Sequence, residues 1–234
     1  MNRVIVDTPF YQKRIVSYGL IVYSKKTHKC IIVQRKHSVE FLMMMSGYYR
    51  PSYLIFLLKW MIQDELMILK SLINTSYNVY KQQLLKIGLN DIDMNYSYQR
   101  FIDITPMLQN YFNNYNIFNN NTLSWTWPKG RLNLDNETIY MCALREFEEE
   151  VEIKLPPSVF TSPTYLSLDM IKTINNKMIE TRCWLYVIED EVNLPPIQNH
   201  KEVNQRCWVD FDEALQLTNT TSIKNVLLDC INKI

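Results

Sequence analysis

The chain has 234 residues, of which 47% are hydrophobic and 21% are charged. A chain of this length and composition can bury a large core, which excludes a wholly disordered protein. Its 25 Lys and Arg residues nearly balance its 24 Asp and Glu residues, so a uniformly polycationic nucleic-acid-binding protein is excluded. Any anion-binding surface must therefore come from local clustering of charge.

Neither the cysteines nor the apolar segments indicate a secreted or membrane protein. The five cysteines are widely spaced and form no CxxC pair, which is typical of reduced thiols in the cytosol or nucleus. The first twenty residues lack the apolar core of a signal peptide. The most apolar stretch, residues 53–69, contains Lys59, Asp64 and Glu65, so we expect a buried helix there rather than a membrane span.

Residues 1–37 form a basic first zone. They contain eight Lys or Arg residues and a single acidic residue, Asp7. Two β-branched runs, residues 17–24 and 30–36, flank the sequence KKTHK, a pattern that predicts a β-hairpin. Arg35 and Lys36 at its end are candidates for contacts with RNA phosphates; an ordinary solvated basic surface is the alternative.

Residues 38–122 differ in pattern and are predicted to form a helical insertion. Apolar residues at helical spacing predict helices over 53–73 and 78–89, the second ending near Gly88. The Tyr- and Asn-rich stretch 110–122 is predicted to be a loop. We expect this insertion to contribute an RNA-binding wall.

Residues 123–234 return to a mixed α/β pattern. The predicted strands are 124–127, 164–170, 178–188 and 207–211, and the predicted helices are 137–151, 212–217 and 222–231.

The helix predicted over 137–151 carries three carboxylates on one face. Glu146, Glu149 and Glu150 stand at positions i, i+3 and i+4, where like charges repel. A hard divalent cation such as Mg²⁺ supplies the missing positive charge and binds carboxylates together with substrate phosphates. A solvated acidic helix surface is the alternative for such a run taken alone.

The residues around this run resemble the Nudix box. That pattern is Gly, five residues, Glu, seven residues, and then Arg-Glu-hydrophobic-any-Glu-Glu-any-Gly-hydrophobic. Here Gly130 precedes Glu137, and the run Arg145 to Ile153 follows, so the box spans 130–153. Two departures are visible: six residues separate Gly130 from Glu137, and Glu152 replaces the last glycine. The second departure concerns the end of the helix more than the metal ligands.

The resemblance implies a role for each matching residue. Glu146, Glu149 and Glu150 would bind Mg²⁺ or Mn²⁺, and Glu149 would also activate the attacking water. Arg145 would brace the glutamates, with Glu137 as its bidentate partner. Lys129 and Gly130 would place a cation and a turn beside the substrate phosphates.

Glu202 is a second candidate catalytic residue. It lies six residues before Trp208, and in the cellular mRNA-decapping Nudix enzymes a Glu at a similar offset serves as general base. A surface carboxylate on a loop is the alternative.

The order of elements narrows the resemblance to the mRNA-decapping Nudix hydrolases of large nucleocytoplasmic DNA viruses, most closely the African swine fever virus type. It implies an α/β fold, a Nudix α/β/α sandwich with a helical domain inserted near the N-terminus. It also implies release of m7GDP from capped mRNA and action in the host cytoplasm, with the virion as a second location. Trp125, Trp127 and Tyr49 are candidates for stacking on the cationic methylguanine ring.

Two other functions stay open. The chain could hydrolyse diphosphoinositol polyphosphates or nucleotide diphosphates without RNA, or it could be an inactive RNA-binding or host-interaction protein. The sequence indicates no oligomeric state.

Overall fold

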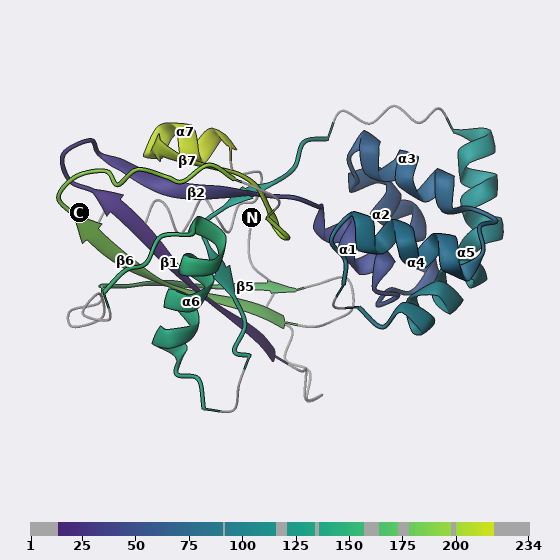
Figure 1. Ribbon diagram of the computed structural model, residues 1–234, viewed down its shortest axis with the longest axis horizontal. Helices are drawn as coiled ribbons and strands as arrows, with labels where there is room; N and C mark the ends of the chain where they lie inside the picture. The colour runs from purple at the N-terminus through teal and green to yellow at the C-terminus, as the bar shows by residue number, and fades with distance from the viewer. Residues whose placement is uncertain are drawn as a thin grey trace, which may run out of the picture.

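The computed structural model describes residues 14–90, 92–115, 121–133, 136–156, 164–172, 178–197 and 200–217. In Figure 1 a mixed sheet with helices on its faces lies beside a separate group of helices. The helix predicted over 222–231 falls outside the described residues. No helix in the described part of the chain combines the length and apolar character needed to cross a membrane.

One mixed sheet forms the centre of the first body. Its strands are β1 (Arg14–Ser24), β2 (Lys29–Arg35), β3 (Trp125–Thr126), β4 (Lys129–Gly130), β5 (Thr164–Lys172), β6 (Met178–Ile188) and β7 (Val203–Asp210). The order is β3-β2-β1-β6-β5, with β4 also paired to β1 and β7 paired to β2. The β1–β6 pair is parallel, and the other pairs are antiparallel.

The β1–β2 hairpin opens away from its turn and admits another segment. The two strands pair at Tyr23↔Cys30 next to the turn. Farther along, β3 pairs with β2 and β4 pairs with β1 at Gly19↔Lys129. A side chain at position 19 would meet the carbonyl oxygen of Pro128 at 2.7 Å, so glycine allows this close approach. The opened hairpin thereby places Lys129 and Gly130 inside the sheet.

Helices cover the sheet on both faces. Helix α6 (Ile139–Val151) packs on Leu20, Val22 and Ile31. Helix α7 (Phe211–Leu217) packs on the opposite face, over residues that include Ile21 and Tyr23. Because successive strand residues point to opposite faces, the buried run of β1 serves both cores. The predicted α/β sandwich is confirmed.

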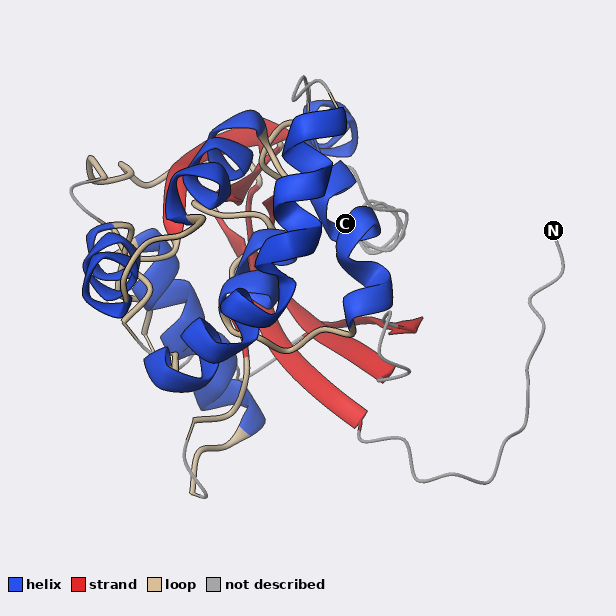
Figure 2. Cartoon of the chain, turned by 90° about the vertical axis from the view of Figure 1, so that its right-hand side faces the viewer, coloured by secondary structure: helices blue, strands red, loops and turns tan. Residues whose placement is uncertain are grey.

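The second body is a helical unit with its own core. It contains α1 (Val39–Met45), a 3₁₀ turn (Pro51–Tyr53), α2 (Leu54–Trp60), α3 (Gln63–Leu72), α4 (Tyr77–Lys86) and α5 (Met94–Asn114). Among the described residues, its core shares no buried residue with the two cores of the sheet. Figure 2 looks onto these helices, with strands of the sheet behind them.

The predicted helix 53–73 is in fact interrupted. Met61 and Ile62 are extended, and α3 starts afresh at Gln63. The buried Glu65 carboxylate accepts the backbone N–H of Ile62 at 3.2 Å, and it accepts both the N–H and the hydroxyl of Ser38 at 2.7 and 2.6 Å. This carboxylate therefore starts α3 and ties it to the segment that leads out of β2.

The predicted loop 110–122 begins too early. Helix α5 continues to Asn114, because its buried side chains keep helical spacing through Leu108 and Phe112. That apolar face packs into the insertion core, which outweighs the modest helix propensity of Asn and Tyr. The last predicted strand was too short, since β7 begins at Val203.

Candidate active site

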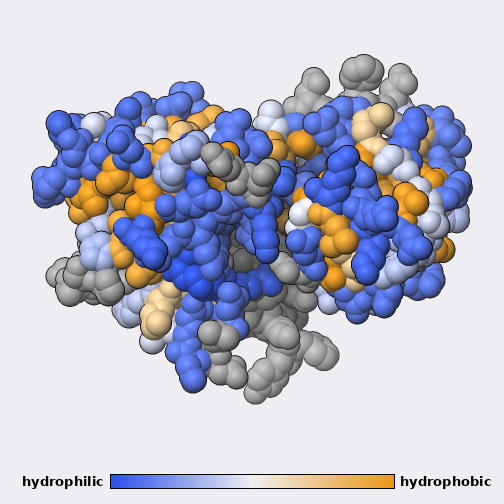
Figure 3. Space-filling view, viewed as in Figure 1, coloured by the Kyte–Doolittle hydropathy of each residue, from blue (hydrophilic) through white to orange (hydrophobic). Residues whose placement is uncertain are grey.

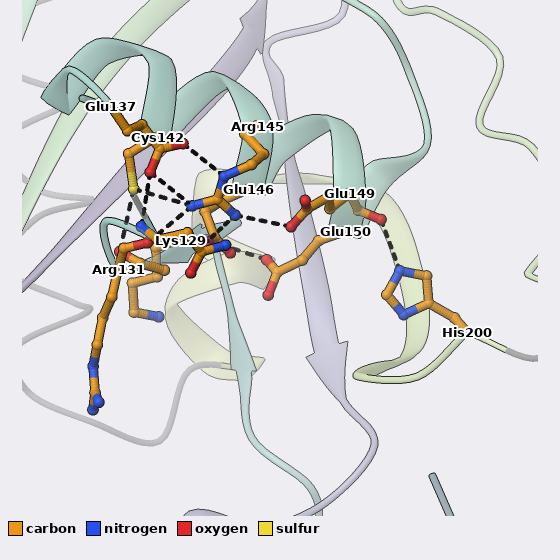
Figure 4. Close-up of polar contacts among 11 residues, drawn as sticks. Lys129, Arg131, Glu137, Cys142, Arg145, Glu146, Glu149, Glu150 and His200 are labelled. Atoms are coloured by element: carbon orange, nitrogen blue, oxygen red, sulfur yellow. Dashed lines mark hydrogen bonds and ion pairs between the residues drawn. The ribbon is translucent and has the colours of Figure 1, made fainter. Parts of the chain in front are cut away.

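Helix α6 is held so that one face is buried and the other carries the charged residues. Thr138 caps its start by accepting the Met141 N–H at 3.2 Å. The apolar face packs into the sheet through Cys142, Ala143, Phe147 and Val151. The predicted spacing therefore places Arg145 and the three glutamates together beside β4 (Figure 4).

Arg145 is the centre of the charged network. Its guanidinium binds Glu137 through two N–H···O contacts, Nε to Oε1 at 2.7 Å and Nη2 to Oε2 at 3.2 Å. The same group donates to Glu146 at 2.7 Å and to Glu149 at 3.0 Å. It also donates to the Arg131 carbonyl at 2.9 Å and to the Cys142 Sγ at 3.6 Å. The expected bidentate contact with Glu137 is present, and Arg145 also holds Glu146 and Glu149 in place.

Glu146 and Glu150 are buried, which is unusual for two neighbouring carboxylates. Burial raises the pKa of Glu150 above its ordinary value, and the Lys129 and Arg35 charges oppose that rise. Burial likewise raises the pKa of Glu146, although Arg145 counteracts it. Burial therefore disfavours the charged form of both carboxylates, and the neighbouring cations only partly offset this rise in pKa.

Lys129 and Gly130 form the floor beneath these carboxylates. The Lys129 N–H donates to Glu150 Oε2 at 3.2 Å, and its ammonium binds the Thr126 hydroxyl over the Trp127 ring. Burial and the nearby Arg35 lower the pKa of Lys129. A Cβ on Gly130 would lie 2.1 Å from the Glu146 carboxylate. Only glycine leaves room for Glu146 to lie against this strand.

The donor set fits a divalent cation in chemistry, although the described residues do not form a ready-made cage. Nowhere in the described ranges do three His, Cys, Asp or Glu side chains converge tightly enough to hold a metal. Glu149 is more than half exposed. Buried oxygen donors that lack full compensation are the ligands that Mg²⁺ and Mn²⁺ prefer.

The end of α6 accommodates Glu152, the residue that replaces the last glycine of the Nudix box pattern. Glu152 adopts a left-handed conformation with φ of 56°, and its N–H caps the Glu148 carbonyl. Arg206 binds the Glu152 carboxylate at 2.5 Å and the Pro195 carbonyl at 2.8 Å. The helix therefore ends after Val151 without the glycine, and an ion pair accompanies the strained residue.

A cavity of about 480 Å³ lies between the sheet body and the helical insertion. The sheet body contributes Glu146, Glu150 and Glu202, and the insertion side contributes Leu42 and the segment after α4. The cationic residues in its wall are Arg35, Lys129, Arg131 and Lys201. In Figure 3 the surface beside α6 is strongly hydrophilic. The structure thus brings Glu202 to the same cavity as Glu146 and Glu150, whereas Glu149 is not part of the described lining.

The predicted cap-stacking residues do not meet at this cavity. Trp127 is buried in the sheet core and Tyr49 in the insertion core, so neither ring has a face exposed to the cavity, and their stacking on a cap stays a prediction. Trp125 is partly buried against the sheet core. No Trp, Tyr or Phe belongs to the described lining of the cavity.

The positions of several charged residues relative to the cavity could not be predicted from the sequence. Lys36 does not line the cavity and instead donates to the His200 carbonyl at 3.4 Å. Arg131, Lys201 and His200 were not anticipated, because isolated charged loop residues give no spacing signal. The one signal in the sequence that could have indicated Lys201 as a cavity residue was its position next to Glu202.

A family model described as the NUDIX domain matches residues 109–230. A search of curated proteins gives no significant match. Among solved structures, the chain is similar to the Ap4A hydrolase of C. elegans in a binary complex, with 12% identity, a TM-score of 0.46, and coverage of 94% of this chain and 96% of that chain.

Two further solved structures give comparable values. The dihydroneopterin triphosphate pyrophosphohydrolase of E. coli shares 13% identity at a TM-score of 0.46, covering 95% of this chain and 99% of that chain. The MutT protein of Methanosarcina mazei Go1 shares 11% identity at a TM-score of 0.44, with 96% of each chain covered.

Proposed function

The chain belongs to the Nudix family and is a Nudix hydrolase, and from this premise we propose that it removes the 5′ cap of mRNA, releasing m7GDP and RNA with a 5′-monophosphate. The observation that carries the proposal is the cavity between the sheet body and the insertion. It places buried carboxylates, Glu202 and four cationic residues around one space.

The charged residues at the cavity and beside it divide into acidic residues that would hold metal ions and cationic residues that would bind phosphates. Glu146 and Glu150, with Glu149 beside them, would hold Mg²⁺ or Mn²⁺, which supplies charge neutralisation and lowers the pKa of a bound water. Arg145 holds Glu146 and Glu149 through contacts of 2.7 and 3.0 Å, and the Lys129 N–H donates to Glu150. Glu202 would accept the proton of the attacking water.

The cations opposite the glutamates would bind the phosphates. Lys129 lies in the sheet beneath Glu150, and Arg35, Arg131 and Lys201 stand around the cavity wall. A cap contains three linked phosphates and continues into an RNA backbone. Cations on both the strand and loop sides of the cavity suit such an extended anion, and the insertion would form the second wall against the RNA. The reaction would take place in the host cytoplasm.

One observation favours a second candidate substrate. The described cavity lining is rich in cations and has no Trp, Tyr or Phe ring, which suits a polyanion without a base, such as a diphosphoinositol polyphosphate. The third function, an inactive RNA-binding protein, is disfavoured because Arg145 still organises three glutamates.

The deciding experiment is thin-layer chromatography of products from cap-labelled RNA. We expect m7GDP to appear only with Mg²⁺ or Mn²⁺, and Glu149→Gln and Glu150→Gln to lose at least ~100-fold in rate. Lys25→Gln, in the turn at the far end of β2, is the matched control. A parallel reaction with a free diphosphoinositol polyphosphate separates the two substrates. Intact capped RNA beside a cleaved inositol substrate would overturn the decapping proposal.

A further inference from the structure

His200 joins the loop that carries Glu202 to the end of α6. Its Nδ1 accepts the backbone N–H of Glu202 at 3.1 Å and that of Val203 at 2.9 Å. Its Nε2 lies 2.7 Å from the carbonyl oxygen of Glu149. Figure 4 shows the ring beside the last turn of the helix. One imidazole therefore contacts both elements that bear candidate catalytic carboxylates.

These partners define the tautomer of His200. Because Nδ1 accepts two N–H groups, its lone pair faces them and the proton resides on Nε2. That proton is donated to the Glu149 carbonyl, which lies in the last turn of α6, where carbonyls lack helical partners. Both ring nitrogens are thus used, and the ring fixes the loop at a set distance from the helix.

Other contacts hold the same short segment from the side of β2. The Lys36 N–H donates to the Glu202 carbonyl at 2.7 Å, and the Lys36 ammonium donates to the His200 carbonyl at 3.4 Å. These contacts fasten the loop to β2 but not to α6. Among the described contacts of residues 200–202, the imidazole alone bridges to the helix.

We propose that His200 is a positioning residue for catalysis: its imidazole, bonded through both ring nitrogens, sets the place of Glu202 relative to the glutamates of α6. The inference rests on the proposed function, because it needs Glu202 to act on the attacking water. A shift of about 1 Å in such a group can cost about 100-fold in rate. His200 is not itself among the described residues that line the cavity, so it acts through Glu202.

The test uses substitutions that remove the contacts separately. In His200→Asn the amide oxygen takes the place of Nδ1 and keeps the two loop contacts, while the shorter side chain no longer reaches Glu149. In His200→Gln the longer amide restores a donor toward Glu149. We expect kcat to fall about 10- to 100-fold in His200→Asn with KM within about twofold, and we expect His200→Gln to recover part of the loss.

A double-mutant cycle with Glu202→Gln tests whether His200 affects kcat through Glu202. If His200 acts through Glu202, His200→Asn has no further effect on kcat in the Glu202→Gln background. An equal fall in both backgrounds would show a general structural role and overturn the proposal. The matched control is His28→Asn, in the turn between β1 and β2, where the ring contacts the Tyr23 hydroxyl; its kcat should equal that of the wild type.

Two features of the test distinguish a failure of the positioning role from a failure of the decapping proposal. The cycle is run on whichever phosphoanhydride the wild type cleaves, capped RNA or a free diphosphate, so loss of the decapping proposal leaves it valid. Amide hydrogen exchange at Glu202 and Val203 gives a second readout, and we expect faster exchange in His200→Ala than in the wild type. Unchanged exchange, or wild-type kcat in His200→Asn, would refute the positioning role.

Discussion

Gly130 and Glu146 approach each other so closely that a single methyl group at position 130 would displace the carboxylate. The Cβ of an alanine would lie 2.1 Å from Glu146, and the backbone there pairs with β1 and cannot withdraw freely. We expect Gly130→Ala to weaken Mn²⁺ binding at least ~10-fold and to lower kcat/KM at least ~100-fold. Titration calorimetry with Mn²⁺ and a cap-release assay measure the two effects.

Leu132→Ala is the matched control for Gly130→Ala, because its exposed side chain follows in the same loop. It should leave both quantities unchanged. Wild-type Mn²⁺ affinity in Gly130→Ala would contradict the idea that Glu146 needs this space.

Glu152 combines an unfavourable backbone conformation with a favourable ion pair. A non-glycine residue at φ of 56° costs about 1 kcal/mol relative to glycine, whereas the carboxylate binds the buried guanidinium of Arg206. Glu152→Ala keeps the backbone cost and loses the ion pair, while Glu152→Gly loses both. We therefore expect Glu152→Ala to be about 1 kcal/mol less stable than Glu152→Gly in urea unfolding. The reverse order would show that the conformation carries no cost here.

At the scale of elements, helix α6 is joined to the preceding loop by the Glu137–Arg145 pair. Arg145 holds the pKa of the Glu137 carboxyl below its ordinary value. A depressed folded-state pKa means that the stabilisation is fully present above the unfolded pKa, about 4.3, and is lost as the pH falls through the folded value. The pair thus contributes to stability at neutral pH and not in strong acid.

We expect Glu137→Gln to lower the unfolding free energy by roughly 1–3 kcal/mol at pH 7, because it removes a charge-assisted contact. The difference from the wild type should narrow as the pH falls below about 4. Urea unfolding between pH 3 and pH 7 measures it, with exposed Glu189→Gln, paired to Lys25, as the control. A difference independent of pH would contradict the ionic origin.

At the scale of the whole molecule, the cavity depends on both bodies. Arg131 and Lys201 belong to the sheet body, yet they face a space closed by the segment after α4. If they bind RNA phosphates, the double variant Arg131→Gln/Lys201→Gln should raise the KM for capped RNA at least ~10-fold with little change in kcat. The slope of log Kd against log salt should fall by about 1.4 for two single-strand contacts.

Lys25→Gln serves as the control for that variant, because Lys25 lies in the hairpin turn, at the opposite end of β2 from Arg35. It should change neither KM nor the salt slope. An unchanged slope in the double variant would place the RNA path elsewhere.

The elements with strong local patterns were predicted from the sequence. Helix α6 follows from its apolar spacing and a polar cap, and β6 from a β-branched and aromatic run. The break at Met61 was not predicted, because its cause is Glu65 bonding to Ser38, 27 residues away. The helical end of α5 was missed for a similar reason, since its apolar face depends on partners in the insertion core.

The sequence by itself determined that Arg145 and the three glutamates lie close together, because their spacing is a property of one helix. Only the tertiary structure decided which residues from other segments contact this helix. Gly130 reaches Glu146 only because the β1–β2 hairpin opens, and His200 meets Glu149 across 51 residues of chain. Tertiary packing also buries Trp127 in the sheet core and Tyr49 in the insertion core. Local spacing fixes neighbours along a helix, whereas contacts between distant segments arise from packing that no local pattern encodes.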